Sequence, residues 1–153
     1  MQVKQIMIKK VVTVKPTTKI TQVANVLTKN GFHGLPVVDS KGKVAGIITE
    51  SDFFIKDIPH LYLPSYIQFL KRAEFAKRVS RKEKEKLFKI TDATAKDIMT
   101  EDCFCISPNL ELNDLIRIIR EKRVYTIPVI DNNKKVVGIV TVADIIKLLK
   151  VVN

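Results

Sequence analysis

The sequence lacks any apolar run that approaches the roughly 20 residues of a membrane-spanning helix. Its first ten residues, MQVKQIMIKK, hold no long apolar stretch and no small-residue cleavage site, so we predict no secretory signal and expect a cytoplasmic protein. The 153 residues are 46% hydrophobic and 28% charged, an ordinary globular composition. A chain of this length buries about 68–70% of its unfolded surface, which excludes a need for a disulfide or structural metal.

Cysteine is scarce. Cys103 and Cys105 are the two cysteines of the chain and stand one residue apart, so on a strand they would point to the same face. A C-x-C pair without a nearby histidine or third cysteine is a poor metal signature. We therefore expect no metal site and interpret the pair as two small buried hydrophobic side chains.

Catalytic signatures are missing as well. The chain has no G-x-x-x-x-G-K-[ST] phosphate loop, no H-E-x-x-H zinc motif and no G-x-S-x-G nucleophile elbow. Its two histidines are His33 and His60, and His60 follows Pro59 without an evident catalytic partner. These absences favour a binding protein over an enzyme.

One sequence motif occurs twice. LPVVDSKGKVAGIITESD spans Leu35–Asp52, and IPVIDNNKKVVGIVTVAD spans Ile127–Asp144. Pro36 and Pro128 set an offset of 92 positions, and this shift aligns about 55 residues without a gap. A duplication explains such agreement. Two copies are too few for a solenoid, so we expect the halves to pack on each other about a pseudo-twofold axis.

Each copy predicts the order strand, helix, strand, strand, helix, which is an α+β fold. In the first copy, Val11–Val14 is apolar and β-branched and is stopped by Pro16, as expected of a short strand. Thr18 or Thr21 is expected to cap a helix that ends at Asn30-Gly31, where glycine accepts a positive φ.

The repeated motif itself predicts a β-hairpin. Strands are expected at 35–38 and 44–48 around a turn at 39–43, and a final helix begins after Thr49 or Thr141. The strands are almost wholly apolar, so both of their faces should be covered. The predicted organisation is a first repeat at 1–57, a helical basic insert at 58–93 and a second repeat at 94–153.

The insert carries much of the net charge of +11. Between positions 71 and 89 nine cations face three anions, a surplus of six positive charges. We expect a helix over about 65–88. Three interpretations stay open: a solvated helix with i, i+4 charge pairs, a partner or dimer contact through its aromatic residues, and binding of nucleic acid or another polyanion. No helix-turn-helix or zinc spacing accompanies the charge.

The ordered set of motifs resembles the CBS domain, named for cystathionine beta-synthase. The repeated motif resembles the core signature of that family. VKQIM and AKDIMT resemble its leading segment, and VTVKP and CISP resemble its first strand. The resemblance covers nearly the whole chain except the insert. It implies a disc with two clefts, frequent homodimers, and regulation of another protein through AMP, ADP, ATP or S-adenosylmethionine, with no catalytic cofactor.

The resemblance also implies ligand-binding residues in the two Thr-x-x-Asp motifs. Asp52 and Asp144 match the aspartate that contacts the ribose, and Thr49 and Thr141 match a residue near the sugar or phosphate. A carboxylate can accept a bond from each ribose hydroxyl, and a helix start attracts phosphate. The alternative is a helix capping box, and both roles can coexist if the cap forms when the site is empty.

Further candidates distinguish the two copies. His33 matches a residue that reaches phosphate in the family, whereas its counterpart Tyr125 carries no positive charge, so the clefts should differ. Ser51 matches a small hydroxyl residue, and its counterpart is Ala143.

The adenine ring is expected near the first strand of each copy, through backbone groups and apolar side chains at Thr13, Val14 and Ile106. The residues before and within the next strand complete the candidate set, with core packing as the alternative: Gly34, Leu35, Pro36, Thr126, Ile127 and Pro128. Because Cys105 and Ala143 lack hydroxyls, we expect Thr13, His33, Ser51 and Asp52 to share the better-equipped cleft.

Overall fold

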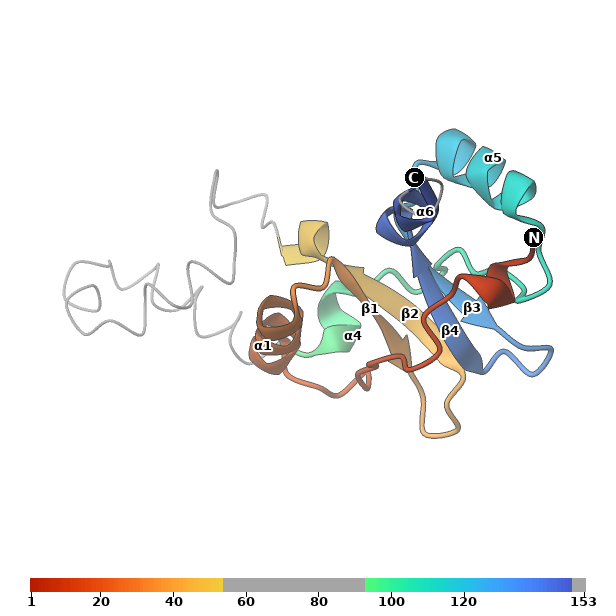
Figure 1. Ribbon diagram of the computed structural model, residues 1–153. Coiled ribbons are helices and arrows are strands. Elements are labelled where there is room, and N and C mark those ends of the chain that lie inside the picture. The colour runs from red at the N-terminus through yellow and green to blue at the C-terminus, as the bar shows by residue number, and fades with distance from the viewer. Residues whose placement is uncertain (54–92, 150–153) are drawn as a thin grey trace, which may run out of the picture.

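The structure is a computed structural model that describes residues 1–53 and 93–149 (Figure 1). The predicted insert helix over about 65–88 and the three interpretations of its charge lie outside these residues.

The two halves contain the same elements at the same offset of 92 positions. The first half holds η1 (Val3–Gln5), α1 (Ile20–Asn30), β1 (Gly34–Val38), β2 (Val44–Thr49) and the short helix η2 (Glu50–Phe53). The second holds α4 (Ala95–Ile98), α5 (Leu112–Lys122), β3 (Thr126–Ile130), β4 (Val136–Thr141) and α6 (Val142–Leu149). The predicted α+β fold and duplication are confirmed.

Each half is built on an antiparallel hairpin with the same register. Gly34 pairs with Thr49 in β1–β2, and Thr126 pairs with Thr141 in β3–β4. Asp39 Oδ1 closes the first turn by accepting bonds from the Lys41 and Lys43 N–H groups at 2.8 and 2.9 Å. This turn lies at the predicted place, and it contains Gly42 at φ 76°.

The predicted strand at 11–14 is wrong in its length. Val14 makes a single parallel bridge to Val37, with its N–H 3.1 Å from Pro36 O. Ile106 bridges Val129 in the same way. A further rung toward residues 11–13 would need an N–H from Pro36 on β1, and proline has none.

The predicted threonine cap of α1 is also wrong. The N-cap is Lys19, and Thr18 Oγ1 accepts a bond from the Lys15 N–H at 3.0 Å instead. The first N–H of the helix, that of Ile20, donates to Ala93 O at 3.0 Å, so the other half satisfies it. The predicted stop at Gly31 is confirmed by its left-handed conformation, φ 63°.

The halves exchange their leading segments. Gln2 bridges Glu111 just before α5, and at the equivalent place Thr94 bridges Lys19 just before α1. Val3, wholly buried, packs in the core of the second half, and its equivalent Ala95 packs in the core of the first. This reciprocal exchange is the expected pseudo-twofold packing, and in Figure 1 the two hairpins lie side by side at the centre.

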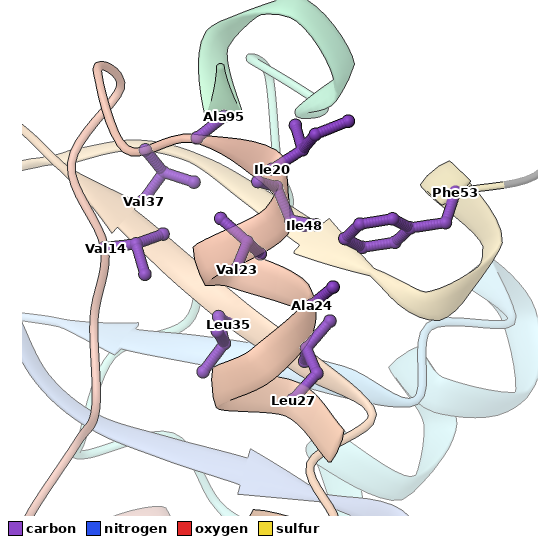
Figure 2. Packing of buried hydrophobic residues seen from close by; sticks show 10 residues of the cluster. All are labelled: Val14, Ile20, Val23, Ala24, Leu27, Leu35, Val37, Ile48, Phe53 and Ala95. Atoms are coloured by element: carbon purple, nitrogen blue, oxygen red, sulfur yellow. The ribbon is translucent and has the colours of Figure 1, made fainter. Parts of the chain in front are cut away.

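Figure 2 shows the first core. Four residues of α1 at helical spacing, Ile20, Val23, Ala24 and Leu27, pack with Val14, Leu35, Val37, Ile48, Phe53 and Ala95. Full burial of one such large aliphatic side chain stabilises the fold by about 1.5–3 kcal/mol. The core therefore fixes α1 against the hairpin and places Glu50–Phe53 at its edge.

Candidate ligand-binding clefts

Two clefts lie between the halves and are related by the same offset. The Thr49 cleft has a volume of about 600 Å³ and is lined by His33, Ile47, Thr49, Glu50, Ser51, Thr100, Asp102, Cys103, Phe104, Val124, Tyr125 and Thr126. The Thr141 cleft has a volume of about 280 Å³ and is lined by Ile8, Lys10, Val11, Val12, Asn30, Gly31, Phe32, His33, Gly34, Leu35, Thr126, Ile139, Thr141, Ala143, Asp144 and Lys147. Small-molecule sites commonly have volumes of about 300–1,000 Å³.

Each cleft combines the end of one hairpin with the leading segment of the other half. Thr100 and Ile47 exchange backbone hydrogen bonds of 2.9 and 3.0 Å at the Thr49 cleft. Ile8 and Ile139 do the same at the Thr141 cleft, again at 2.9 and 3.0 Å. The segments that follow, 101–104 and 9–12, are thereby held along the cleft walls.

Two glycines allow this close crossing. A Cβ at Gly46 would lie 2.6 Å from Thr100 O and 3.0 Å from Met99 Sδ. At the equivalent Gly138 a Cβ would collide with the side chain of Met7. A larger residue at Gly46 would therefore displace the crossing segment and, with it, a cleft wall, whereas one at Gly138 would require the Met7 side chain to turn aside.

The predicted grouping of Thr13, His33, Ser51 and Asp52 in one cleft is wrong. Thr13 is exposed and lines neither cleft, while Ser51 faces the 100–104 segment of the second half. The physical reason is the exchange of leading segments, which brings the first strand region of one half to the hairpin end of the other.

Both Thr-x-x-Asp motifs act as caps in this structure. Asp52 Oδ2 accepts bonds from Thr49 N and Oγ1 at 2.7 and 3.1 Å, and Asp144 Oδ2 accepts bonds from Thr141 N and Oγ1 at 2.9 and 2.7 Å. Ser51 Oγ lies 2.8 Å from Thr49 Oγ1. Asp144 lines its cleft, whereas Asp52 is not among the lining residues of the other.

Asp144 is the buried charge of the Thr141 cleft, with 6% of its surface exposed. Burial raises the pKa of its carboxyl, but hydrogen bonds from Thr141 and from Lys147 Nζ, 3.0 Å from Oδ1, outweigh burial, so the pKa lies below its ordinary value. The carboxylate is therefore ionised at neutral pH, and it is held rigidly at the start of α6.

A model of the CBS domain matches residues 3–57 and 95–151 of the chain. The chain belongs to the CBS-domain family. Its matched residues include both hairpins, both Thr-x-x-Asp motifs and both leading segments, so the two halves described above are the two CBS repeats.

Known proteins are similar to this chain in sequence or in fold. Inosine-5′-monophosphate dehydrogenase of Methanocaldococcus jannaschii is 28% identical over 146 residues, which are 95% of this chain and 23% of that enzyme. The crystal structure of the CBS domain pair of protein MJ0100, in complex with 5′-methylthioadenosine and S-adenosyl-L-methionine, superposes with a TM-score of 0.71 at 24% identity and covers 100% of this chain and 98% of that one. The structure of CBSX2 in complex with AMP has a TM-score of 0.72 at 20% identity, over 99% and 98%. The last two similarities show the fold.

His33 and Tyr125 do not divide between the two clefts of the CBS pair, so the predicted difference between a His33 cleft and a Tyr125 cleft stays a prediction. His33 is exposed, lines both clefts, and holds its Nδ1 3.2 Å from Glu50 Oε2. Tyr125 is 63% exposed and lines the Thr49 cleft. Thr126 lies between the clefts and lines both.

Several predicted ligand residues lie in the cores of the CBS repeats instead. Val14 and Ile106 are 8% and 5% exposed and line neither cleft, and their backbone groups already bond β1 and β3. Pro36, Ile127 and Pro128 are also buried away from both clefts. Gly34 and Leu35 line the Thr141 cleft. For the buried residues, core packing, the stated alternative, describes their place.

Sequence reasoning missed several charged and sulfur-containing residues of the clefts. Lys10, Asp102, Cys103 and Lys147 all line a cleft. Lys10 and Asp102 occupy equivalent positions at the offset of 92, so an alignment of the halves already contained this signal. What it lacked was the exchange that brings both residues to the clefts.

Cys103 lines the Thr49 cleft, and Cys105 contacts Cys103. Their Sγ atoms are 3.6 Å apart, and both residues are half-buried rather than fully buried as predicted. The hydrogen bond from Cys105 lowers the pKa of the Cys103 thiol, and the same contact raises the pKa of Cys105. In the described part of the chain no three metal-binding side chains gather into a site. Among those residues, too, no helix is long and apolar enough to span a membrane.

Proposed function

We propose that this CBS pair is a regulatory, ligand-sensing module that binds adenosine-containing nucleotides in the clefts between its repeats and performs no catalysis. The observation that carries the proposal is the ionised Asp144, held at the start of α6 in a cleft between the two repeats. CBS pairs are generally regulatory rather than catalytic. The complexes of similar folds with AMP, methylthioadenosine and S-adenosylmethionine support the ligand class.

The chemistry of the Thr141 cleft suits a nucleoside. A ribose offers two adjacent hydroxyls, and a carboxylate has about four acceptor positions for such donors. Asp144 uses three of them for the bonds from Thr141 and Lys147. One acceptor position is therefore left for a ribose hydroxyl. A second becomes available if the Thr141 Oγ1 hydroxyl turns away when the ligand binds. The N-terminus of α6 adds a partial positive charge beside the same site.

The two clefts are placed to influence each other. They share the lining residues His33 and Thr126. A ligand that orders one cleft therefore changes the free energy of binding in the other, and a separate regulated protein can respond to the resulting shift in population.

The proposal is tested by titration calorimetry and thermal unfolding with AMP, ADP, ATP and S-adenosylmethionine. We expect Asp144→Asn to weaken binding at least tenfold. The matched control is Asp97→Asn, because Asp97 Oδ2 caps Thr94 through bonds of 2.7 and 2.9 Å but lines neither cleft. A ligand present at 100 times its Kd adds about 2.7 kcal/mol to the free energy of unfolding.

No binding of any adenosine compound to the wild type would refute the sensor. Salt-dependent binding of duplex DNA in the same assay would favour the rival function, in which the basic residues between 71 and 89 bind nucleic acid. Equal losses in Asp144→Asn and Asp97→Asn would refute the ribose role of Asp144.

The proposal also includes a homodimer, a separate regulated chain and a cytoplasmic location. Ile116 on α5 and Ile146 on α6 support the dimer, because they leave 37% and 53% of their surface in solvent. Light scattering at increasing concentration should give twice the mass of 17.4 kDa. A constant monomer mass would refute the dimer.

A further inference from the structure

The two clefts carry opposite charge at equivalent positions. Lys10 lines the Thr141 cleft, and Asp102, its partner at the offset of 92, lines the Thr49 cleft. Both side chains are exposed. The exchange of one cation for one anion is a difference of two charges at the same place in two otherwise related sites.

The rest of each lining reinforces this contrast. In the Thr141 cleft Lys147 neutralises Asp144 at 3.0 Å, which leaves the charge of Lys10 as the surplus. In the Thr49 cleft the Glu50 carboxylate lies 3.2 Å from His33 Nδ1, so the contrast rests on the anion Asp102, and the described lining residues include no lysine or arginine.

We propose that charge sorts ligands between the clefts: the Thr141 cleft takes adenosine phosphates, and the Thr49 cleft takes adenosine ligands whose 5′ substituent is uncharged or cationic. The inference rests on the proposed function and names the ligand class of each site. A 5′-phosphate is attracted by Lys10 in the first cleft and repelled by Asp102 in the second. A sulfonium or thioether group avoids that repulsion.

The test measures each cleft alone. Ser51 and Ala143 are exposed, occupy equivalent positions and line different clefts, so Ser51→Trp fills the Thr49 cleft and Ala143→Trp fills the Thr141 cleft. AMP, 5′-methylthioadenosine and adenosine are titrated into both variants at low ionic strength, where charge interactions are least screened. We expect AMP to bind more tightly than methylthioadenosine in Ser51→Trp, and the opposite order in Ala143→Trp.

Charge reversals then identify the cause. Lys10→Glu should weaken AMP binding to the Thr141 cleft about tenfold, and Asp102→Lys should strengthen AMP binding to the Thr49 cleft by a similar factor, since a charge pair in a solvated cleft acts between the limits for water and for a protein surface. Adenosine binding should change little in either variant. Lys9→Glu and Glu101→Lys are the controls, because they make the same changes in net charge at exposed neighbours that line neither cleft.

The outcomes separate the inference from the proposed function. If no adenosine compound binds the wild type, the proposed function fails. If adenosine binds but AMP shows the same preference in both clefts, or the control reversals act as strongly as Lys10→Glu and Asp102→Lys, the charge sorting alone is refuted. If a tryptophan variant does not fold, the charge reversals are made in the protein that keeps both clefts. There, Lys10→Glu must weaken AMP binding and Asp102→Lys must strengthen it, and any other result refutes the charge sorting.

Discussion

Replacement of the two crossing glycines by alanine should have unequal effects on stability. At Gly46 the added Cβ would lie 2.6 Å from Thr100 O, a backbone atom that also accepts the Ile47 N–H at 3.0 Å. The crossing segment must move, because a backbone oxygen has no rotamer to change. At Gly138 the nearest atoms all belong to Met7, a flexible side chain that can turn aside.

The expected magnitudes follow from these contacts. Overpacking costs about 1–3 kcal/mol. Weakening of the two Ile47–Thr100 backbone hydrogen bonds adds about 0.5–1.5 kcal/mol each. Reduced freedom of the unfolded chain returns about 0.4–1 kcal/mol to an alanine variant. We therefore expect Gly46→Ala to lower the free energy of unfolding by about 2–4 kcal/mol, and Gly138→Ala by less than about 1.5 kcal/mol.

Urea unfolding of single and double variants checks this reasoning. Met7→Ala should reduce the cost of Gly138→Ala, whereas Met99→Ala should leave the cost of Gly46→Ala unchanged, since Thr100 O still blocks the Cβ. Because Thr100 lines the Thr49 cleft, Gly46→Ala should also weaken binding there and spare the Thr141 cleft. Equal costs for the two glycines, or rescue of Gly46→Ala by Met99→Ala, would refute the role assigned to the Thr100 carbonyl.

Three further predictions concern single residues. Because the pKa of Asp144 is lowered on folding, its ionised carboxylate stabilises the fold fully above the ordinary pKa of 3.8, and this stabilisation is lost as the pH falls through the folded-state pKa. In urea unfolding, the difference in stability between wild type and Asp144→Asn should therefore be full at pH 6 and shrink below about pH 4. A difference that does not change with pH would contradict this. Arg123 and Lys134 have φ values of 52° and 62°, a left-handed conformation that costs a residue with a side chain about 1–2 kcal/mol. Glycine removes this cost but loses about 0.5–1 kcal/mol in chain entropy, so Arg123→Gly or Lys134→Gly should each stabilise the fold by about 0.5–1 kcal/mol, measured as a higher Tm. A lower Tm would show that these side chains contribute more than the strain costs. Iodoacetamide should label Cys103 before Cys105 because the pKa of Cys103 is lowered, and a ligand of the Thr49 cleft should slow that labelling; mass spectrometry of the modified peptides decides the order.

The fold was predictable because its information is local and repeated. The alternation of apolar runs with polar turns identified both hairpins, and Asn30-Gly31 identified the end of α1. Thr-x-x-Asp was predicted either to cap or to bind ribose. Bonds of 2.7–3.1 Å at Asp52 and Asp144 show the cap, and the ribose role stays a prediction. The strand at 11–14 was overestimated because strand propensity alone does not supply a partner for each N–H.

The sequence by itself determined that two copies of one unit exist, which residues form their hairpins, and that the copies differ at His33 and Tyr125. Only the tertiary structure decided which residues share a cleft. The leading segment of each repeat crosses to the other, over Gly46 and Gly138, and so brings Asp102 to Thr49 and Lys10 to Thr141. The physical reason is that each repeat depends on residues far away in sequence. Val3 and Ala95 each pack in the core of the other repeat, and Ala93 O accepts the first N–H of α1, that of Ile20. No local sequence pattern specifies such distant partners.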